Sequence, residues 1–503
     1  MRWFQRLKLR ADERGVALPF IAVILLLLLG MAAFAVDLGW IFLNGARVQR
    51  AADSAALAGV IYLPNDTNNV TSFSIAGAQA NGYDIGTLTE GATGTPGPTG
   101  TGGPDSLAWR SLEDNKLEVT LDSSIGTFFL KVFGFQTFDI KRISTAEYIK
   151  PVPLGSPDPC FGMGSLGSIG DCTPASPQNF WAAVSGPWTN KHNGDAHSTE
   201  WWSSGGWSAP ANPNSQYRNP GGYYVGYYMG VDVPSGAGAV TVSVYDAGFY
   251  DRGAFSTETG DREQDSNGGA NMEFRLWKWD STPLDPADNT VLQPGCSFTI
   301  PSGAFDTTYK NEWVPLCTIP ALEPGLYVLQ VWSTGDLGGT NQYAVRAQST
   351  NAPDARVYAI NDMSIFTNQG GAVSTLYLAE IIEDHAGKIL ELDFYDPGED
   401  NANAFMTVQL PDGSPAQCTW YAVNETGATI NGPAGGPADC RIQTSNGSPI
   451  FNGYWVHARI VIPDPVCSSD CWFKMIIENS QPHDRTTWSA RVIGNPVKLS
   501  PNE

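Results

Sequence analysis

The sequence predicts an N-terminal transmembrane helix, a small α+β module and a mainly all-β body of two tandem antiparallel β-sandwich repeats, jelly-roll-like in type. Three observations predict this fold class. An uncharged apolar run extends from Val16 to Val36, and about 20 such residues cross the ~30 Å hydrocarbon core of a membrane as a helix. Two stretches of the C-terminal part align on each other without a gap. Short alternating strands, separated by Gly, Pro, Asn and Asp, fill most of that part.

The charges around the apolar run predict its orientation. Lys and Arg are enriched on cytoplasmic flanks, and the first charge after the run is Asp37. We therefore expect a single-pass protein of the cell membrane, with the N-terminus inside and the bulk of the chain exported. A cleaved secretory signal is the alternative, but its apolar centre usually spans only about 7–15 residues. Good helix formers also continue beyond Val36, which favours a retained anchor. The basic residues before the run are Arg2, Arg6, Lys8, Arg10 and Arg14.

The N-terminal segment also carries short motifs in a specific order. Residues 13–15 (ERG) precede the apolar run, residues 36–39 (VDLG) lie at its outer end, and residues 49–59 (QRAADSAALAG) follow. In this order, residues 12–62 resemble TadG-like proteins of tight-adherence (Flp) pilus assembly. Residues 128–148 resemble the closing segment of the same module. The resemblance implies a membrane-anchored, export-side component of the pilus apparatus, with a pilin-like module, Tad-apparatus partners and no enzymatic activity.

We predict four parts along the chain: a cytoplasmic tail, transmembrane helix and outward extension in 1–63, a small α+β module in 64–150, and the two β repeats in 156–355 and 356–503. A length of 503 residues fits three or four domains. The net charge of −22 argues against nucleic acid as a partner, because nucleic-acid binding needs a basic surface. The 54 Gly and 35 Pro fit a turn-rich exported β protein.

The small module is predicted to hold a helix over 74–85 and a half-buried strand over 117–121. The N-terminal helix should continue to about Leu63, since Pro64 disfavours helix in the residue before it. Its outer half is rich in small residues, which allow close packing either on this module or on a helix of a partner subunit. We expect the module's hydrophobic core to include Phe128, Phe129, Val132, Phe133 and Phe135.

The repeat rests on a gapless alignment of residues 221–248 with residues 371–398, in which the alternating strand keeps its register. Tyr245-Asp246 falls on Tyr395-Asp396. Weaker similarities follow, of residues 325–331 with 453–460 and of residues 344–347 with 489–492.

Eight cysteines, an even number, all lie beyond Lys150, in the part expected to be exported. This distribution predicts disulfides in an oxidising compartment. Connectivity does not follow from sequence, but sequential pairing is the simplest. Zinc is a poor alternative, because the CSSDC motif at 467–471 lacks a second Cys/His pair nearby. The cysteines are Cys160, Cys172, Cys296, Cys317, Cys418, Cys440, Cys467 and Cys471.

Each repeat places carboxylates just after its clearest strand: Asp246 and Asp251 in the first, and Asp396, Glu399 and Asp400 in the second. Hard oxygen ligands on a flexible loop suit a structural Ca²⁺. Turns stabilised by the Asp side chains, with solvated charge, explain the same pattern and are the favoured interpretation. We expect no other cofactor.

Two further groups of residues are candidate sites. Trp201, Trp202 and Trp207 could form an exposed patch for a surface glycan or a partner protein, but core packing or cover of a sheet edge is the favoured interpretation. His192 and His197 flank Asp195 but have no third ligand in a recognisable metal motif.

We therefore expect a non-enzymatic, membrane-anchored component of Flp/Tad-type pilus assembly, whose β repeats contact proteins or surfaces outside the membrane. An anchored adhesin that binds a glycan or another surface is the main alternative. A secreted polysaccharide hydrolase is a weaker one, because no catalytic arrangement is legible in the sequence.

Overall fold

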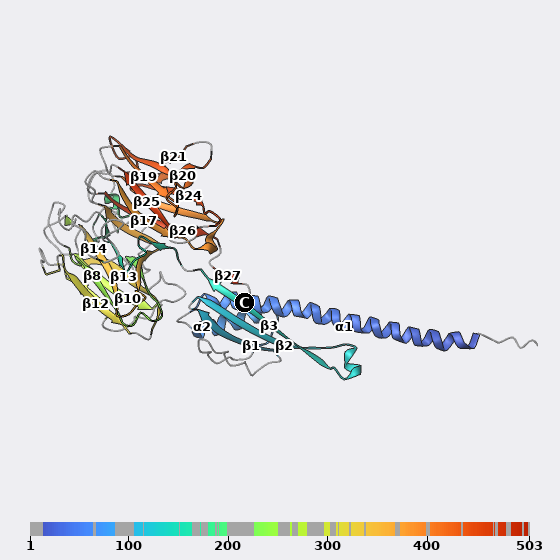
Figure 1. Cartoon of the computed structure of the whole chain (residues 1–503). Helices are drawn as coiled ribbons and strands as arrows, with labels where there is room; N and C mark the ends of the chain where they lie inside the picture. The colour runs from blue at the N-terminus through green and yellow to red at the C-terminus, as the bar shows by residue number, and fades with distance from the viewer. Residues whose placement is uncertain are drawn as a thin grey trace, which may run out of the picture. The chain divides into compact units, whose positions relative to one another are not determined.

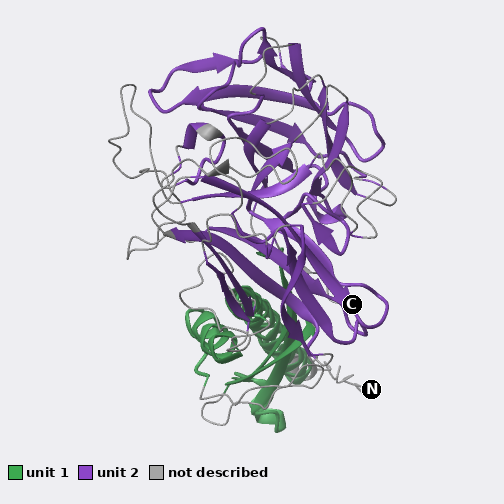
Figure 2. Ribbon diagram, turned by 90° about the vertical axis from the view of Figure 1, so that its left-hand side faces the viewer, with its two compact units in different colours: residues 1–149, 496–503 green, residues 150–495 purple. Residues whose placement is uncertain are grey.

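The computed structural model divides the chain into two compact units, residues 1–149 with 496–503, and residues 150–495 (Figures 1 and 2). Each unit is described by itself. The structure describes residues 14–63, 67–85, 105–113, 115–149, 151–162, 172, 180–186, 189, 191–198, 226–249, 262–263, 270–278, 296–301, 308–309, 311–320, 323–335, 339–367, 373–398, 403–433, 436–465, 467, 471–478, 484–494 and 497–500.

The first unit begins with one long helix, α1 (Arg14–Val60), of 47 residues. At 1.5 Å per residue it is about 70 Å long. Within the described part of the chain, α1 alone has the length and apolar composition that a membrane crossing requires, and its apolar stretch is not buried by the protein. It ends three residues before the expected Leu63, in a turn closed by the Tyr62 N–H donating to the Gly59 carbonyl.

The C-terminal half of α1 packs on its own module. Its fully buried residues recur at three- and four-residue spacing, so they form one face of the helix. This confirms packing within the module, the first of the two alternatives for the small residues. The buried residues of this face are Val48, Ala51, Ala52, Ala55, Ala56 and Val60.

A second helix, α2 (Thr67–Gln79), packs against this face. It starts seven residues earlier than the predicted helix over 74–85 and stops near the predicted Asn81-Gly82 turn, where Gly82 adopts a left-handed φ of 89°. The two helices touch backbone to backbone at Gly77. A Cβ there would lie 2.8 Å from the Ser54 carbonyl oxygen and 2.9 Å from the Ala55 Cα.

A four-stranded antiparallel sheet completes the unit, in the order β1 (Asp105–Glu113), β2 (Lys116–Gly126), β3 (Thr137–Tyr148) and β27 (Val497–Ser500). The last strand comes from the C-terminus of the chain, although the sequence predicts that residues 356–503 belong to the second repeat. Lys498 pairs with Glu147 at 3.6 Å across β27 and β3. A four-residue strand carries too little pattern to show which sheet it joins.

The predicted aromatic core of this unit is wrong. Phe128, Phe129, Val132, Phe133 and Phe135 lie at the tip of the β2–β3 hairpin, around the 3-10 helix η1 (Leu130–Phe133), and are exposed. The core instead consists of the buried face of α1 and the inward residues of β1 and β2, among them Trp109, Leu117 and Val119. Apolar character alone predicted burial, but this segment lies beyond the two layers that form the core.

The second unit is an antiparallel β body, which agrees with the predicted mainly β class. Ten strands form one of its sheets. In spatial order they are β11 (Ser297–Ile300), β10 (Ala270–Lys278), β13 (Gly325–Gly335), β7 (Tyr227–Val233), β15 (Arg356–Ile360), β4 (Pro153–Leu154), β17 (Ser374–Glu380), β25 (Trp472–Glu478), β19 (Asn403–Gln409) and β23 (Arg441–Asn446).

The other sheet has thirteen strands. Its main path is β12 (Trp313–Ile319), β8 (Val240–Tyr245), β14 (Gly339–Ser349), β6 (Phe180–Ser185), β16 (Asp362–Thr367), β26 (Asp484–Ile493), β18 (Ile389–Tyr395), β24 (Tyr454–Val461), β20 (Gln417–Asn424) and β21 (Thr429–Asn431). Three short strands join it at the side, β5 (Cys160–Phe161), β9 (Arg262–Glu263) and β22 (Ala438–Asp439).

Both sheets run without a break through the predicted boundary at residue 356. In the larger sheet, β16 pairs with β6 of the first half and with β26 of the second. In the other sheet, β15 pairs with β7 of the first half. The two halves therefore share continuous hydrogen-bonded sheets and form one compact unit rather than two separate domains.

The gapless alignment places β8 on β18, but β7 and β17 are offset by 147 residues rather than 150, and the later similarities do not agree with the strand positions. β8 and β18 both keep their inward residues fully buried. However, β13 and β24, which carry residues 325–331 and 453–460, lie in different sheets. Arg346 lies opposite Ser243, and Ser489 lies opposite Asp393. Ser243 and Asp393 correspond in the gapless alignment, so Arg346 corresponds to Ser489. The match of 344–347 with 489–492 is therefore displaced by two residues. Alternating strands resemble one another whichever sheet they join.

The eight cysteines form four disulfides in sequential order: Cys160–Cys172, Cys296–Cys317, Cys418–Cys440 and Cys467–Cys471. The second and third join the two sheets near their outer ends. Cys296 directly precedes β11, and Cys317 lies in β12; Cys418 lies in β20, and Cys440 directly precedes β23.

Removing the Cys296–Cys317 bridge should loosen this end of the body. We expect the double variant Cys296→Ala/Cys317→Ala to lose about 3 kcal/mol of unfolding free energy, as for a closed loop of about this size. Urea-induced unfolding without reductant measures the loss. Cys467→Ala/Cys471→Ala, which opens a much shorter loop, is the matched control. An equal or larger loss in the control would contradict this expectation.

Candidate functional site

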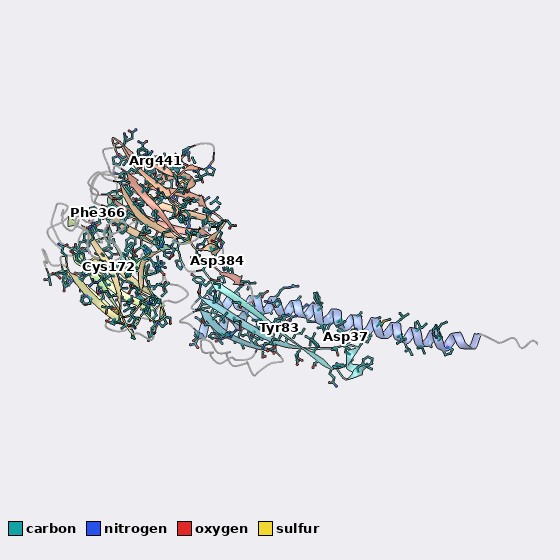
Figure 3. The ribbon with its side chains drawn as sticks, viewed as in Figure 1. Asp37, Tyr83, Cys172, Phe366, Asp384 and Arg441 are labelled. Carbon is teal, nitrogen blue, oxygen red and sulfur yellow. A yellow bond between two sulfur atoms is a disulfide. The ribbon has the colours of Figure 1, made fainter. Side chains whose placement is uncertain are left out.

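The first candidate site joins α1 to the β2–β3 hairpin at Asp37, the first charged residue after the apolar run. Its carboxylate is 1% exposed and accepts three backbone N–H bonds from the start of η1. The N–H of Phe128 lies 2.8 Å from one oxygen, and those of Phe129 and Leu130 lie 2.9 and 2.6 Å from the other. Trp40 packs edge-on against Phe128 at 5.3 Å between ring centroids. Asp37 therefore holds the hairpin tip against the helix (Figure 3).

The QRAADSAALAG motif forms the other contacts between α1 and the module. Gln49 donates to the Ile143 carbonyl of β3 at 3.2 Å and to Asp53 at 2.8 Å. At Gly59, a Cβ would lie 2.1 Å from the Ser74 hydroxyl oxygen and 2.8 Å from Leu117, so any larger residue would have to displace these side chains. The motif residues that carry the resemblance thus have defined packing roles. Val36 is exposed at the end of the apolar run, and the side chain of Val16 lies outside the described part.

The second candidate site consists of two turns with the same geometry, at Asp246 after β8 and at Asp396 after β18. Both aspartates are buried and left-handed, with φ of 53° and 54°. Asp246 accepts the Asn311 N–H at 3.2 Å, and its own N–H donates to the Glu312 carbonyl. In the other turn, Asp396 accepts the Gly453 N–H at 2.6 Å, and its own N–H donates to the Tyr454 carbonyl. These contacts match the favoured interpretation, an aspartate that stabilises a turn.

Calcium at these turns remains a prediction. No group of three His, Cys, Asp or Glu suited to a metal occurs among the residues that the structure describes. Asp251, Glu399 and Asp400 lie outside those residues, as do Trp201, Trp202 and Trp207. The proposed ligand set and the proposed aromatic patch are therefore not placed.

We expect Asp396→Ala to lower the unfolding free energy by about 2 kcal/mol, because a buried N–H loses a charged acceptor. Asp396→Asn keeps one acceptor oxygen and tolerates the left-handed backbone, so it should lose less. Urea-induced unfolding measures the unfolding free energies of Asp396→Ala and Asp396→Asn. Equal losses would contradict this role for the carboxylate. Added Ca²⁺ that raises the midpoint of the unchanged protein, but not of Asp396→Asn, would favour a calcium site.

The third candidate site is the polar segment 191–198, which begins with the 3-10 helix η2 (Lys191–Asn193) and packs on the second half of the body. Lys191 is 2% exposed and forms an ion pair with Glu425, above the ring of Tyr395. Gly453 also faces the ring of His192. Burial lowers the pKa of Lys191 to about 8, so it is still mostly protonated at pH 7 and can pair with the carboxylate.

Asp195 holds the other end of the segment. Its carboxylate is fully buried and accepts the Ser185 N–H at 3.0 Å, the His197 N–H at 3.1 Å and the Tyr227 hydroxyl at 2.6 Å. Thr487 of β26 both donates to the Gly194 carbonyl and accepts the Ala196 N–H, each at 3.0 Å. The segment thereby fastens β6 and β7 to β26 by hydrogen bonds.

The two histidines do not come together with Asp195 as a metal set. The Nε2 atom of His192 is 3.8 Å from Glu425, whereas that of His197 is 3.8 Å from Asp362. The sequence singled out KHNGDAH but could not identify Glu425, Tyr227 or Thr487 as its partners, because they lie far away along the chain.

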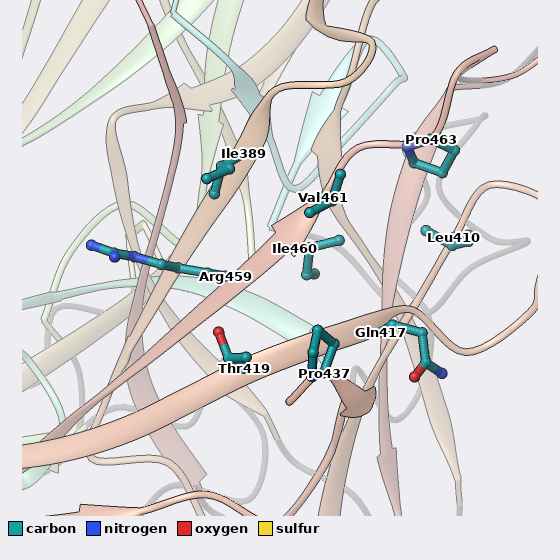
Figure 4. A pocket seen from close by; sticks show the side chains of 9 residues that line it. All are labelled: Ile389, Leu410, Gln417, Thr419, Pro437, Arg459, Ile460, Val461 and Pro463. Carbon is teal, nitrogen blue, oxygen red and sulfur yellow. The ribbon is translucent and has the colours of Figure 1, made fainter. Parts of the chain in front are cut away.

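A pocket of about 390 Å³ lies on the larger sheet, over β18, β24 and β20 (Figure 4). Its lining contains no carboxylate and one charged residue, Arg459, which donates to Glu391 at 2.8 Å. Burial acts to raise the pKa of Glu391, but the hydrogen bonds from Arg491 and Arg459 outweigh it and lower that pKa. The pocket is mainly apolar. It is lined by Ile389, Leu410, Gln417, Thr419, Pro437, Arg459, Ile460, Val461 and Pro463.

The comparisons with known proteins agree with the N-terminal motifs. Residues 15–66 match the family model described as "Putative Flp pilus-assembly TadE/G-like", which confirms the resemblance of the N-terminal segment. Among curated proteins, none matches this chain. A solved structure of a Paenibacillus xanthan lyase aligns with 78% of this chain and 36% of its own length, at 9% identity and a TM-score of 0.14. The chain thus spans about a third of that protein, and a likeness this weak carries no argument.

Proposed function

We propose that this protein is a non-enzymatic, single-pass membrane component of a Flp/Tad-type pilus-assembly apparatus. The basic N-terminal tail lies in the cytosol, the apolar part of α1 crosses the membrane, and the β body is exported. The observation that carries the proposal is the TadE/G-like match over residues 15–66, in which the motif residues form the contact between α1 and its module. The exposed apolar surface of α1 supports the crossing.

The exported β body makes the contacts of the protein with other pilus proteins or with a surface. Its four disulfides support an oxidising, extracytoplasmic location. We also propose that its two halves derive from one duplicated domain. The matched turns at Asp246 and Asp396 support the duplication, since both the left-handed φ and the cross-strand hydrogen bonds occur twice.

Purification of the tagged full chain from detergent-solubilised membranes tests the proposal. We expect other Tad-apparatus proteins to co-purify. Cells are permeabilised in their outer layer only and treated with a thiol reagent that does not cross the inner membrane. The reagent should label a cysteine introduced in the β body of the protein, but not one introduced in the N-terminal tail. Labelling of the tail alone, or a chain that washes off the membrane at high pH, would contradict the proposal.

A further inference from the structure

The tip of the β2–β3 hairpin, residues 127–138, exposes an unusual amount of apolar surface for a turn. Val132 is 80% exposed and Phe133 is 75% exposed. Single exposed apolar residues are common on proteins, but a contiguous cluster marks a contact site. Lys131 is the only charged residue of this segment. The exposed apolar residues of the tip are Phe128, Phe129, Val132, Phe133, Phe135 and Phe138.

The position of the tip along α1 indicates what it contacts. Asp37 binds the tip at the outer end of the apolar run, so the tip lies where that run ends. Figure 1 shows the hairpin running alongside α1, with its cyan turn next to the helix and α1 continuing past it toward Arg14. The helix surface at this level is apolar and exposed too, at Val36, Leu38 and Phe42. Helix and tip therefore both expose apolar side chains at the outer end of the apolar run.

Contact with hydrocarbon favours backbone polar groups that are paired within the protein, and several N–H groups of the tip are paired in this way. Asp37 accepts three of the N–H groups. The N–H groups of Val132, Gly134 and Phe135 donate to carbonyls within the turn at 3.0–3.2 Å. The long side chain of Lys131 can reach the headgroups while its stem stays among apolar atoms.

We propose that the hairpin tip inserts into the interface of the outer leaflet beside the transmembrane helix, so that the protein contacts the lipid bilayer at two places. This inference rests on the membrane crossing of α1 in the proposed function. Asp37 sets the depth of the tip relative to the helix, and the aromatic side chains occupy the boundary between headgroups and acyl chains, where such rings are favoured. Two contacts fix the tilt and rotation of the module relative to the membrane, which one helix alone leaves free.

Spin labels on the full chain test the insertion. The described cysteines are all in disulfides, so a single added cysteine gives one labelling site. The protein is placed in vesicles of phosphatidylethanolamine and phosphatidylglycerol, and collision rates with oxygen and with a water-soluble nickel chelate are compared. Val132→Cys reports the tip, Leu27→Cys reports the centre of the apolar run, and Lys141→Cys, farther along β3, is the aqueous control.

We expect the label at Val132 to collide with oxygen several-fold more than with the nickel chelate, like the label at Leu27, and the label at Lys141 to show the reverse. Water-like collisions at Val132 with lipid-like collisions at Leu27 would overturn the insertion and leave the anchor standing. Water-like collisions at both would overturn the anchor and the insertion together. Low collision rates with both reagents at Val132 would assign the tip to a protein partner and overturn the lipid contact.

Discussion

Lys191→Met should lower the unfolding free energy of the β body by about 3–5 kcal/mol. The ammonium group of Lys191 is buried against Glu425 and lies over the Tyr395 ring, so its removal leaves that carboxylate with little access to water and without its lysine partner. Urea-induced unfolding of the full chain in detergent measures the change. The effect should be large because this contact joins a segment of the first half to the second half.

The double variant Lys191→Met/Glu425→Leu is the matched test of that explanation. Replacing both charges by apolar side chains of similar size removes the stranded carboxylate, so the double variant should recover most of the lost stability. A double variant that is as unstable as the sum of Lys191→Met and Glu425→Leu would show that the two side chains do not act as a pair.

Because of Lys191, we also expect the unfolding free energy to depend on pH. Because burial lowers the pKa of Lys191 to about 8, the unfolded chain, with a lysine pKa of 10.5, binds more protons than the folded protein between these values. Stability should therefore rise with pH across this window by the contribution of Lys191. The difference in unfolding free energy between the unchanged protein and Lys191→Met should widen from pH 8 to pH 10.5, because only the unchanged protein gains this contribution. A constant difference would contradict the lowered pKa.

The second large effect is expected at the helix contact of the first unit. In Gly77→Val, the new side chain would overlap the backbone of α1 at Ser54 and Ala55, which cannot turn aside as a flexible side chain can. We expect a loss of about 3 kcal/mol from overpacking, or roughly a hundredfold faster exchange of the protected amides of α2 and β2. Hydrogen exchange with mass spectrometry reads these two elements separately from the β body.

Gly39→Ala is the matched control in the same unit. A Cβ at Gly39 meets no atom within 4 Å, and alanine favours a helix over glycine by about 1 kcal/mol. The control should leave exchange of α2 and β2 unchanged. Normal protection in Gly77→Val would show that α1 and α2 are not in backbone contact there.

The local parts of the fold followed from the sequence because their physical causes are local. The apolar run, the helix stop at Asn81-Gly82 and the alternating residues of β2 each act over a few neighbours. The correspondence of β8 with β18 could also be predicted, since a strand that keeps its register keeps its buried face.

The parts that could not be predicted depend on contacts between residues distant in the chain. Nothing around Val497 shows that β27 pairs with β3. The aromatic residues of the hairpin tip have the composition of a core, and only the position of the tip beyond the sheet leaves Phe133 exposed. Likewise, the motif containing Asp37 is visible in the sequence. The hydrogen bonds that Asp37 accepts from a turn some ninety residues later could not be predicted, because they depend on the fold.

The site interpretations differ in the same way. The aspartates of the matched turns could be interpreted as turn residues from the sequence, because Asp is a typical turn residue. The structure identifies the backbone N–H groups that donate to them. The partners of Lys191 and Asp195 had no local signal, because Glu425 and Tyr227 come from strands and turns elsewhere in the body.

We propose that the TadE/G-like segment places this protein in a Tad-type apparatus. The most direct test of this proposal replaces residues 14–36 or, separately, residues 37–66 in cells that make pili of this kind. An unrelated transmembrane helix in place of residues 14–36 keeps the module contacts, whereas an unrelated helix in place of residues 37–66 removes them while the anchor remains.

Pili on the cell surface are counted and compared with those of a deletion strain. The proposal predicts that the deletion lowers the number of pili, that the first replacement restores it and that the second does not. Normal piliation in the deletion strain, or full restoration by the second replacement, would contradict it.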